Sequence, residues 1–304
     1  MILTTPQQPG DNSPPLTASD FQRLAQLVRR EAGLDLPEMK EMLVYSRLVG
    51  RVRELGFSDF GQYADLLSRP GTEPERQRLI NALTTNTTQF FREKHHFAYL
   101  AQEALPPLIA QARKGARLRI WSAGCSSGEE AYSLAFTLLE ACPNAAQLDI
   151  KILATDIDAD VLSQAILGKY PESALHKLPQ TVMTRHFTPV DDHAWQVNAE
   201  ARALIHFRSL NLIKPLPMRG PFDIVFCRNV AIYFDAATQD LLWKQLNGIT
   251  APGGYLFLGH SERLSSPTKE EFGLQGVTIY RKRPSAVPND LGQLEASQGE
   301  PPCR

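Results

Sequence analysis

The chain has 304 residues, of which 43% are hydrophobic and 21% are charged. This composition is typical of an ordinary globular protein with about two domains. Its formal net charge of −1 excludes a global basic field that would hold nucleic acid or an anionic membrane. No apolar run reaches the roughly 18 residues of a membrane span, and residues 1–16 lack the basic and apolar regions of a signal peptide. We therefore expect a cytoplasmic protein with no membrane insertion and no nucleic-acid partner.

The cysteines are scattered along the chain as Cys125, Cys142, Cys227 and Cys303. Their spacing matches neither a disulfide framework nor the paired ligands of a zinc site. We expect reduced thiols and no bound metal.

The two ends of the chain differ in composition from the rest. Residues 1–16 and 284–304 are rich in Pro, Gln, Ser and Asn, which predicts flexible tails. In residues 17–84, apolar side chains recur at helical spacing between breaks at Gly33, Gly56 and Gly71. The pattern predicts a small N-terminal all-helical domain. Its expected buried residues are Phe21, Leu24, Leu27, Val28, Leu48, Val52, Leu55, Phe60, Tyr63, Leu67, Leu79, Ile80 and Leu83.

In residues 85–283, the pattern differs: short apolar runs alternate with helical stretches. The runs RLRIWSAG, DIKILATD, FDIVFCRN and GYLFLGH are continuous enough to be strands buried on both faces. They predict an α/β fold with a parallel sheet. The final run LQGVTIYRKR leaves no room for a crossover helix, so we expect it to lie antiparallel at the sheet edge. Between about residues 170 and 208, the runs RHFTPV, AWQVN and ALIHFRS predict a small antiparallel insertion.

The junction after the first of these strands reads WSAGCSSGEE, residues 121–130. Its small residues let a ligand approach the backbone, and a helix start offers free N–H groups. A tight turn capped by Ser126 or Ser127 explains the same residues. The dinucleotide motif G-x-G-x-x-G is absent, and the carboxylates of Glu129 and Glu130 would repel a phosphate. They suit a ligand with hydroxyls, which argues against a nicotinamide-dependent dehydrogenase.

The next strand ends in ATDID, residues 154–158. A carboxylate at this strand end, here Asp156, is the position that grips ribose hydroxyls in nucleoside-binding α/β sheets. Asp156 or Asp158 could instead cap the following helix, and we expect Asp158 to do so.

Two further segments carry polar side chains. TTNTTQFFREKHHF, residues 84–97, joins the two domains and combines hydrogen-bonding residues with poor helix propensity. A simpler interpretation is a capped linker whose Phe90 and Phe91 dock on the core. FCRNVAIYF, residues 226–234, places Arg228, Asn229 and Tyr233 just past a buried strand, where open α/β sheets bind ligands.

Taken together, NTTQFFRE, WSAGCSSGEEAYS, ATDID, FCRNVAIYF and GHSE closely resemble the bacterial chemotaxis receptor glutamate O-methyltransferases, the CheR family. The resemblance covers roughly residues 21–281. It implies a class I S-adenosylmethionine-dependent methyltransferase (Rossmann-like) sheet with a reversed edge strand, the N-terminal all-helical domain and an inserted antiparallel β-subdomain. The implied cofactor is S-adenosylmethionine, with S-adenosylhomocysteine as product. The implied substrates are glutamate side chains on the cytoplasmic helices of chemoreceptors, and we expect a monomer.

The resemblance also implies roles for particular residues. Arg92 and Tyr233 match the positions that attend the reacting groups. The cofactor site implied by the resemblance contains Asn86, Thr88, Arg92, Ala123, Glu129, Asp156, Asn211, Leu212, Arg228 and Asn229.

Substrate recognition leaves two questions open at this stage. The expected helix from about Lys40 to Glu54 presents Arg47 and Arg51 one turn apart, with Arg53 nearby, and we expect these to guide an acidic receptor helix. A solvated polar face explains the same arginines. Family members that tether to a receptor C-terminal pentapeptide have a Gly-rich loop in the β-subdomain. This chain has no glycine between Gly168 and Gly220, which predicts tether-free recognition. A non-catalytic S-adenosylmethionine-binding module that docks on receptors is the alternative function.

Overall fold

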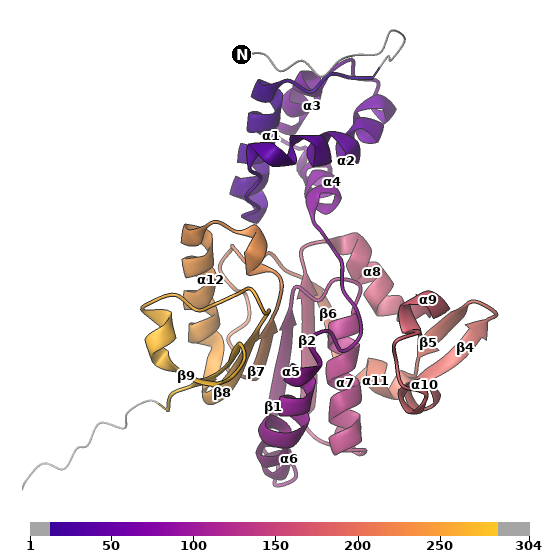
Figure 1. The fold of residues 1–304 in the computed structure, drawn as a ribbon, viewed down its shortest axis with the longest axis vertical. Coiled ribbons are helices and arrows are strands. Elements are labelled where there is room, and N and C mark those ends of the chain that lie inside the picture. The colour runs from indigo at the N-terminus through magenta and orange to yellow at the C-terminus, as the bar shows by residue number, and fades with distance from the viewer. Residues whose placement is uncertain (1–12, 285–304) are drawn as a thin grey trace, which may run out of the picture.

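A computed structural model describes residues 13–284, and the predicted tails fall mainly outside this range, as does Cys303. A helical bundle lies at one end of a larger α/β unit, and an extended segment joins the two (Figure 1). None of the helices within the described range combines the length and apolarity that crossing a membrane requires.

The helical bundle forms where apolar residues recur at helical spacing. Its elements are α1 (Ala18–Ala32), the 3₁₀ turn η1 (Glu38–Lys40), α2 (Glu41–Glu54), α3 (Phe60–Leu67) and α4 (Glu73–Leu83). Thr17 and Asp20 form a capping box at the start of α1, and Gly33 ends the helix at φ +73°. Of the expected core residues, all except Leu55 are buried, and Leu55 packs partly buried against them. The prediction of an all-helical domain is confirmed.

The α/β unit contains a seven-stranded sheet in the order β6-β2-β1-β7-β8-β10-β9. Strands β6, β2, β1, β7 and β8 are parallel, and β10 runs antiparallel to both of its neighbours. The bounds are β1 (Leu118–Ala123), β2 (Ile150–Asp156), β6 (Ile205–Ser209), β7 (Phe222–Cys227), β8 (Thr250–Leu258), β9 (Phe272–Gly276) and β10 (Ile279–Lys282). The four runs expected to be buried parallel strands are β1, β2, β7 and β8, so that prediction is confirmed.

Helices cover both faces of this sheet. One layer contains α5 (Lys94–Tyr99), the π-helical turn η2 (Leu100–Ala104), α6 (Leu105–Ala112), α7 (Glu129–Ala141) and α8 (Ala159–Leu167). The opposite face is covered by α12 (Ala236–Ile249). Short 3₁₀ turns are η3 (Ala145–Gln147), η4 (Ala231–Tyr233) and η5 (Thr268–Glu271).

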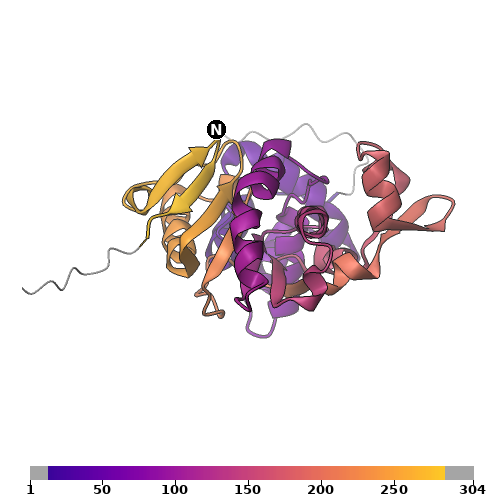
Figure 2. The same ribbon diagram turned by 90° about the horizontal axis from the view of Figure 1, so that it is seen from below.

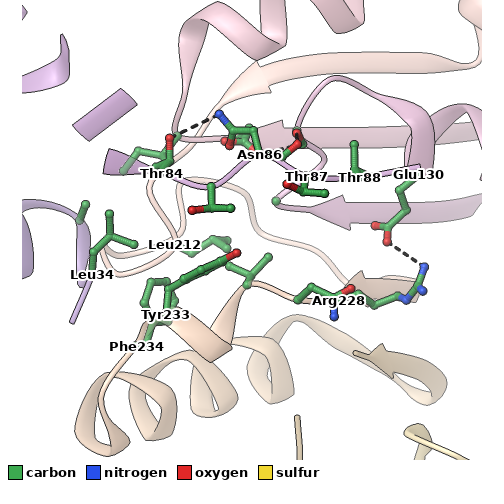
Figure 3. A pocket seen from close by; sticks show the side chains of 18 of the residues that line it. Leu34, Thr84, Asn86, Thr87, Thr88, Glu130, Leu212, Arg228, Tyr233 and Phe234 are labelled. Carbon is green, nitrogen blue, oxygen red and sulfur yellow. Dashed lines mark hydrogen bonds and ion pairs between the residues drawn. The ribbon is translucent and has the colours of Figure 1, made fainter. Parts of the chain in front are cut away.

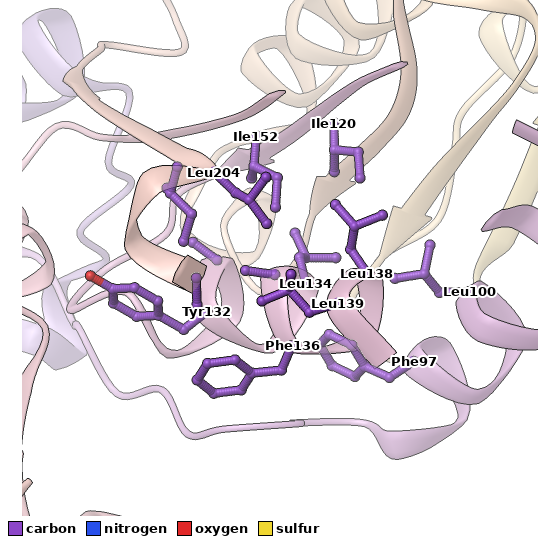
Figure 4. Packing of buried hydrophobic residues seen from close by; sticks show 14 of the residues in the cluster. Phe97, Leu100, Ile120, Tyr132, Leu134, Phe136, Leu138, Leu139, Ile152 and Leu204 are labelled. Carbon is purple, nitrogen blue, oxygen red and sulfur yellow. The ribbon is translucent and has the colours of Figure 1, made fainter. Parts of the chain in front are cut away.

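Neighbouring residues of a strand belong to different cores because side chains alternate across the sheet. Ile120 packs with α7, where Phe136 and Leu138 fill the layer (Figure 4). Trp121 packs on the other side in a cluster that continues into the helical bundle. The bundle therefore shares a hydrophobic core with one face of the sheet.

The inserted subdomain follows α8 and contains a three-stranded antiparallel sheet in the order β3-β5-β4. It projects from the end of the molecule opposite β9 and β10 (Figure 2). The elements are β3 (Lys169–Pro171), α9 (Glu172–Leu175), α10 (Gln180–His186), β4 (Phe187–Asp191), β5 (Ala194–Val197) and α11 (Ala199–Ala203). The Tyr170 hydroxyl donates to the Ser127 carbonyl over 2.7 Å, which ties the subdomain to the loop after β1.

The structure corrects two strand placements. The run ALIHFRS was expected within the insertion, but Ile205–Ser209 forms β6 and pairs in parallel with β2. An edge strand is covered on fewer sides, so its partly polar sequence resembles that of an antiparallel strand. The run LQGVTIYRKR was expected to lie antiparallel at the sheet edge, and β10 within it is antiparallel. The run also contains the end of β9, joined to β10 by a turn at Val277 and Thr278, and β9 rather than β10 takes the edge.

Candidate active site

A cavity lies at the carboxyl ends of β1, β2 and β7, beneath the helical bundle. It contains about 960 Å³ of space between protein atoms, including the part open to solvent. Residues from the linker, from the loops after the three strands and from the bundle line it (Figure 3). The predicted residues among them are Asn86, Thr88, Arg92, Asp156, Asn211, Leu212, Arg228, Asn229 and Tyr233. The tertiary structure thus brings together nine positions that are widely separated in the sequence.

Two predicted positions lie outside this cavity, since Gly124 and Glu130 line it and Ala123 and Glu129 do not. Ala123 is the last residue of β1, and its side chain is fully buried in the core behind the cavity. Gly124 follows at φ +78°, and a Cβ there would lie 2.3 Å from Cγ2 of Val230. Only a glycine can therefore occupy this turn.

Helix geometry explains why the side chain of Glu130, and not that of Glu129, reaches the cavity. Successive residues of α7 point about 100° apart. Glu130 points back toward β1, where the Ser122 hydroxyl donates to Oε1 over 2.7 Å. Glu129 accepts a hydrogen bond from the Ser127 hydroxyl and lines a second hollow beside Lys177 of the subdomain. Sequence spacing alone could not distinguish two adjacent glutamates at the start of a helix.

Asp156 ends β2 with its carboxylate at the cavity wall. Oδ2 accepts from the Ser126 N–H over 2.8 Å, and Oδ1 accepts from the Asp158 N–H over 3.0 Å. Each oxygen keeps a second lone pair for a ligand. Burial raises the pKa of Asp156 above its ordinary value, although both N–H donors oppose the shift. Asp158 accepts from the Asp160 N–H and caps α8, as predicted.

The linker between the domains is fastened to the loops of the sheet. The Asn86 side chain donates to Oδ2 of Asp158 over 2.7 Å, and the Asn86 carbonyl accepts from the Ser126 hydroxyl over 2.8 Å. Phe90 is buried in the core, as the simpler interpretation of this segment required. The linker therefore forms one wall of the cavity and places Arg92 there.

Arg92 donates from Nη1 to the Thr87 carbonyl over 3.1 Å. In the described part of the chain, no ion pair joins its guanidinium to a carboxylate within 4.0 Å. A carbonyl leaves most of the positive charge uncompensated. Arg92 is therefore able to receive an anion that enters the cavity.

Arg228 lies at the same wall, but carboxylates surround it. Its side chain is 1% exposed, with Nη1 3.1 Å from Oε2 of Glu130 and Nη2 3.3 Å from Oε2 of Glu93. It also donates to the Arg92 carbonyl. Burial raises the pKa of Glu130, and Arg228 opposes the shift. Burial acts in the same direction on Glu93, but Arg228 and His260 outweigh it, so the pKa of Glu93 is lowered.

Glu93, His95 and His96 bring possible metal-ligand atoms within 4.8 Å of one another. The Glu93 oxygen that faces His96 also faces the Arg228 guanidinium. A fixed positive charge at this oxygen opposes a second cation there. We therefore assign the group to the Arg228 ion-pair cluster.

The helical bundle closes the cavity from above. Asn211 donates from Nδ2 to the Glu31 carbonyl at the end of α1 over 2.6 Å. The Asp35 N–H donates to the Tyr233 carbonyl over 2.8 Å, and Leu34 pairs with Phe234 as an isolated β-bridge. These contacts hold the Tyr233 ring along the cavity wall (Figure 3).

Backbone strain concentrates around this cavity. The non-glycine residues with positive φ within the described range are Phe91, Glu93, Ser126, Asn229 and Thr278. Ser126 and Asn229 line the cavity, Phe91 and Glu93 flank Arg92, and Thr278 contacts His96. Each such conformation costs about 1–3 kcal/mol and persists where the surrounding structure enforces it.

The structure gives internal partners to two of the three arginines expected to dock substrate. Arg47 donates to the Thr84 carbonyl over 2.7 Å at the end of α4. Arg51 makes two hydrogen bonds to Glu75, at 2.9 and 2.6 Å, and an ion pair with Glu54. Arg53 is exposed and contacts Ser13. The contacts of Arg47 and Arg51 therefore give no support to a docking role.

Sequence reasoning assigned no role to Glu262 of the GHSE segment. Its carboxylate is buried beneath the loop that carries Arg228 and Tyr233, and only 4% of the residue is exposed. The GHSE motif contributed to the family resemblance, but the sequence could not show that Glu262 reaches residues 229–231, more than 30 positions earlier in the chain.

Comparisons with known proteins agree with this arrangement. The family model described as "CheR methyltransferase, SAM binding domain" matches residues 86–280, and "CheR methyltransferase, all-alpha domain" matches residues 19–84. A probable chemotaxis protein methyltransferase of Rhizobium etli is 44% identical over 84% of this chain and 96% of its own length. The chemotaxis protein methyltransferase of Salmonella typhimurium is 42% identical over 87% and 90%. The chain belongs to the CheR methyltransferase family, and residues 86–280 form its S-adenosylmethionine-binding domain.

Proposed function

We propose that this enzyme transfers the methyl group of S-adenosylmethionine to glutamate side chains on the cytoplasmic helices of chemoreceptors. The observation that carries the proposal is that Asp156, Arg92 and Tyr233 line the same cavity beneath the helical bundle. The similarity to chemotaxis protein methyltransferases along most of the chain supports the receptor as substrate.

The residues of the cavity fit the cofactor. Asp156 supplies a carboxylate for the ribose hydroxyls, and Glu130 supplies one near the methionine end, where an ammonium group needs a partner. Leu212, Ile157 and Val230 provide apolar wall for the adenine ring. Gly124 lets Val230, which also lines the cavity, pack closely against the backbone after β1. When bound, the cofactor supplies an electrophilic methyl group on a sulfonium.

The acceptor needs no general base. A glutamate carboxyl has an ordinary pKa of about 4.3, so it is already an anion at neutral pH. Its attack on the sulfonium methyl converts two opposite charges into a neutral ester and a neutral thioether. Because charge disappears along the reaction, excluding water and aligning the groups should supply much of the acceleration.

Arg92 and Tyr233 would position the acceptor. The uncompensated guanidinium of Arg92 attracts the substrate carboxylate, and the Tyr233 hydroxyl can donate a neutral hydrogen bond. The neutral donor orients the carboxylate without stabilising its charge as strongly as a second cation would. The bundle, which contributes Leu34 and Ala32 to the wall, restricts access of water.

Radiolabelled methyl transfer to receptor-containing membranes tests the proposal. We expect label on the receptor that alkaline treatment releases as volatile methanol, which identifies an ester. Cofactor binding without label on any receptor would favour the non-catalytic docking module instead.

We further propose that recognition does not depend on a receptor C-terminal pentapeptide. The β4–β5 connection of the subdomain, Asp191 to Ala194, contains no glycine, and the Lys169 ammonium lies 2.8 Å from Oδ2 of Asp191. Direct docking on the receptor bundle should weaken as salt screens charge beyond roughly 10 Å at 0.1 M. Micromolar binding of the isolated pentapeptide in a calorimetric titration would overturn this part of the proposal.

A further inference from the structure

The loop between β7 and α12 is built around a buried carboxylate. Glu262 accepts hydrogen bonds from the N–H groups of Asn229 (2.8 Å), Val230 (2.9 Å) and Ala231 (2.7 Å). It also accepts one from the Gly259 N–H over 2.6 Å. Four backbone donors thus converge on one side chain that is 4% exposed.

The three consecutive N–H groups form an anion-binding nest. Asn229 has a left-handed conformation at φ +59°, and Val230 follows at φ −112°, which turns the N–H groups of residues 229–231 toward one point. Such nests bind phosphates and carboxylates in other proteins. Here the Glu262 carboxylate fills the nest, so the nest cannot hold the carboxylate of a substrate.

Glu262 and Asn229 are also packed tightly against Gly259, at the end of β8. A Cβ at Gly259 would lie 2.6 Å from Nδ2 of Asn229 and 2.7 Å from Oε2 of Glu262. The ends of the parallel strands β7 and β8 therefore touch through Glu262 with no space for a side chain at Gly259. Any displacement of Glu262 would release the loop that carries the cavity residues.

We propose that Glu262 is the positioning residue of this active site, an internal anion that fixes the loop from Arg228 to Tyr233. It does not line the cavity and acts through the three N–H groups of the loop that it holds. One end of the loop places Arg228 between Glu93 and Glu130, and the other end places the Tyr233 ring at the cavity. The inference rests on the proposed methyl transfer.

Both carboxylate oxygens are needed for this role, because each accepts two of the four backbone hydrogen bonds. A glutamine has the same length but only one acceptor oxygen, and its NH₂ group would face N–H donors. Glu262→Gln should therefore leave at least one backbone donor unpaired and shift the loop. A shift of about 1 Å in a positioned group costs on the order of 100-fold in rate.

The test compares Glu262→Gln and Glu262→Ala with Glu270→Gln, a control at an exposed glutamate in η5. We expect Glu262→Gln to reduce receptor methylation about 100-fold, mainly in kcat. We expect its affinity for S-adenosylhomocysteine, measured by calorimetry, to fall about ten-fold. Glu270→Gln should match the wild type in both measurements.

Rescue by an added anion separates positioning from a general loss of stability. In Glu262→Ala the emptied nest should accept formate, so millimolar formate should restore part of the methylation and of the product affinity. Asp156→Ala removes a different carboxylate of the cavity and should gain nothing from formate. If Glu262→Ala does not fold, Gly259→Ala disturbs the same contact and should show the loss without rescue.

Wild-type methylation and binding by Glu262→Gln would overturn the inference. Absence of rescue in a folded Glu262→Ala would overturn it as well. A wild-type enzyme that binds the product but labels no receptor would instead refute the proposed function, and the calorimetric comparison would still decide the role of Glu262.

Discussion

Two arginines of this protein each lie between two glutamates, yet their surroundings differ. In the helical bundle, Arg51 makes two hydrogen bonds to Glu75 and an ion pair with Glu54. Tyr63 and Arg78 also donate hydrogen bonds to the Glu75 carboxylate.

At the cavity, Arg228 faces Glu93 and Glu130, but its Nε has no hydrogen-bond partner. Oε2 of Glu93 and Nδ1 of His96 are likewise buried without one. The first cluster satisfies its polar groups, and the second does not.

The pKa of Glu75 in the bundle and the pKa values of Glu130 and Asp156 at the cavity shift in opposite directions, whereas the pKa of Glu93 is lowered like that of Glu75. The hydrogen bonds from Arg51 lower the pKa of Glu75, although burial opposes them. At the cavity, burial raises the pKa values of Glu130 and Asp156. Buried polar groups without full compensation are costly, and they cluster where a ligand completes them. The comparison separates a partly exposed ion-pair cluster with satisfied polar groups from a buried cluster at the cavity that leaves polar atoms unpaired.

The largest expected effect tests this distinction directly. Arg228→Leu leaves Glu93 and Glu130, whose side chains are only 12% exposed, with no guanidinium, so the free energy of unfolding should fall by about 3–5 kcal/mol. Arg51→Leu should cost about 1 kcal/mol, because the Arg51 side chain is 21% exposed and Glu75 keeps Tyr63 and Arg78. Urea unfolding of both variants measures the difference. Equal losses of unfolding free energy in Arg228→Leu and Arg51→Leu would contradict the contrast between the two clusters.

Arg92 should matter to catalysis rather than to stability. Arg92→Ala removes an uncompensated charge at the cavity, so receptor methylation should fall about 100-fold, roughly 2.7 kcal/mol of transition-state stabilisation. The melting temperature should stay at the wild-type value. Lys94→Ala removes a nearby exposed cation and serves as the control. Wild-type methylation by Arg92→Ala would remove Arg92 from the mechanism.

Asp156 should matter to cofactor binding. Asp156→Ala removes one or two charge-assisted hydrogen bonds to the ribose, each about 1.5–3 kcal/mol. Calorimetric titration with S-adenosylhomocysteine measures the loss. Asp149→Ala alters the opposite end of β2 and should bind the product as the wild type does. Unchanged affinity in Asp156→Ala would show that another group holds the ribose.

The smallest effect is a pH dependence of the helical bundle. The pKa of Glu75 is lowered in the folded protein, so its stabilising contribution is complete above the ordinary carboxyl value of 4.5. The contribution is lost as pH falls through the lowered value. We expect Glu75→Gln to lose stability at pH 7 but to change less than the wild type between pH 5 and pH 3. Calorimetric melting across this range measures both, and parallel pH profiles would contradict the assignment.

Acid should act differently on the cavity. Because the pKa values of Glu130 and Asp156 are raised, falling pH protonates them more readily in the folded than in the unfolded protein, and this favours the fold. Glu130→Gln should therefore change the pH profile in the direction opposite to that of Glu75→Gln. A change in the same direction would contradict the contrast between the two regions.

Much of the fold could be predicted from the sequence, because local patterns specify it. Helical spacing identified the four helices of the bundle, and continuous apolar runs identified β1, β2, β7 and β8. Asp156 was identifiable because it directly follows a buried strand, and nine of the eleven predicted catalytic and cofactor positions line one cavity. These features depend on a few neighbouring residues, and a linear sequence displays them directly.

Tertiary structure alone decided which way side chains point and which distant segments meet. It placed Glu130 rather than Glu129 at the cavity, assigned β6 to the main sheet, and brought Glu262 beneath residues 229–231. It also showed that Arg47 and Arg51 form hydrogen bonds with residues of the same chain, Thr84 and Glu75. These outcomes depend on strand pairing and on the convergence of loop ends, which involve residues far apart in the chain. No local periodicity encodes such long-range contacts, so the sequence determined the elements and the tertiary structure determined the site that they form.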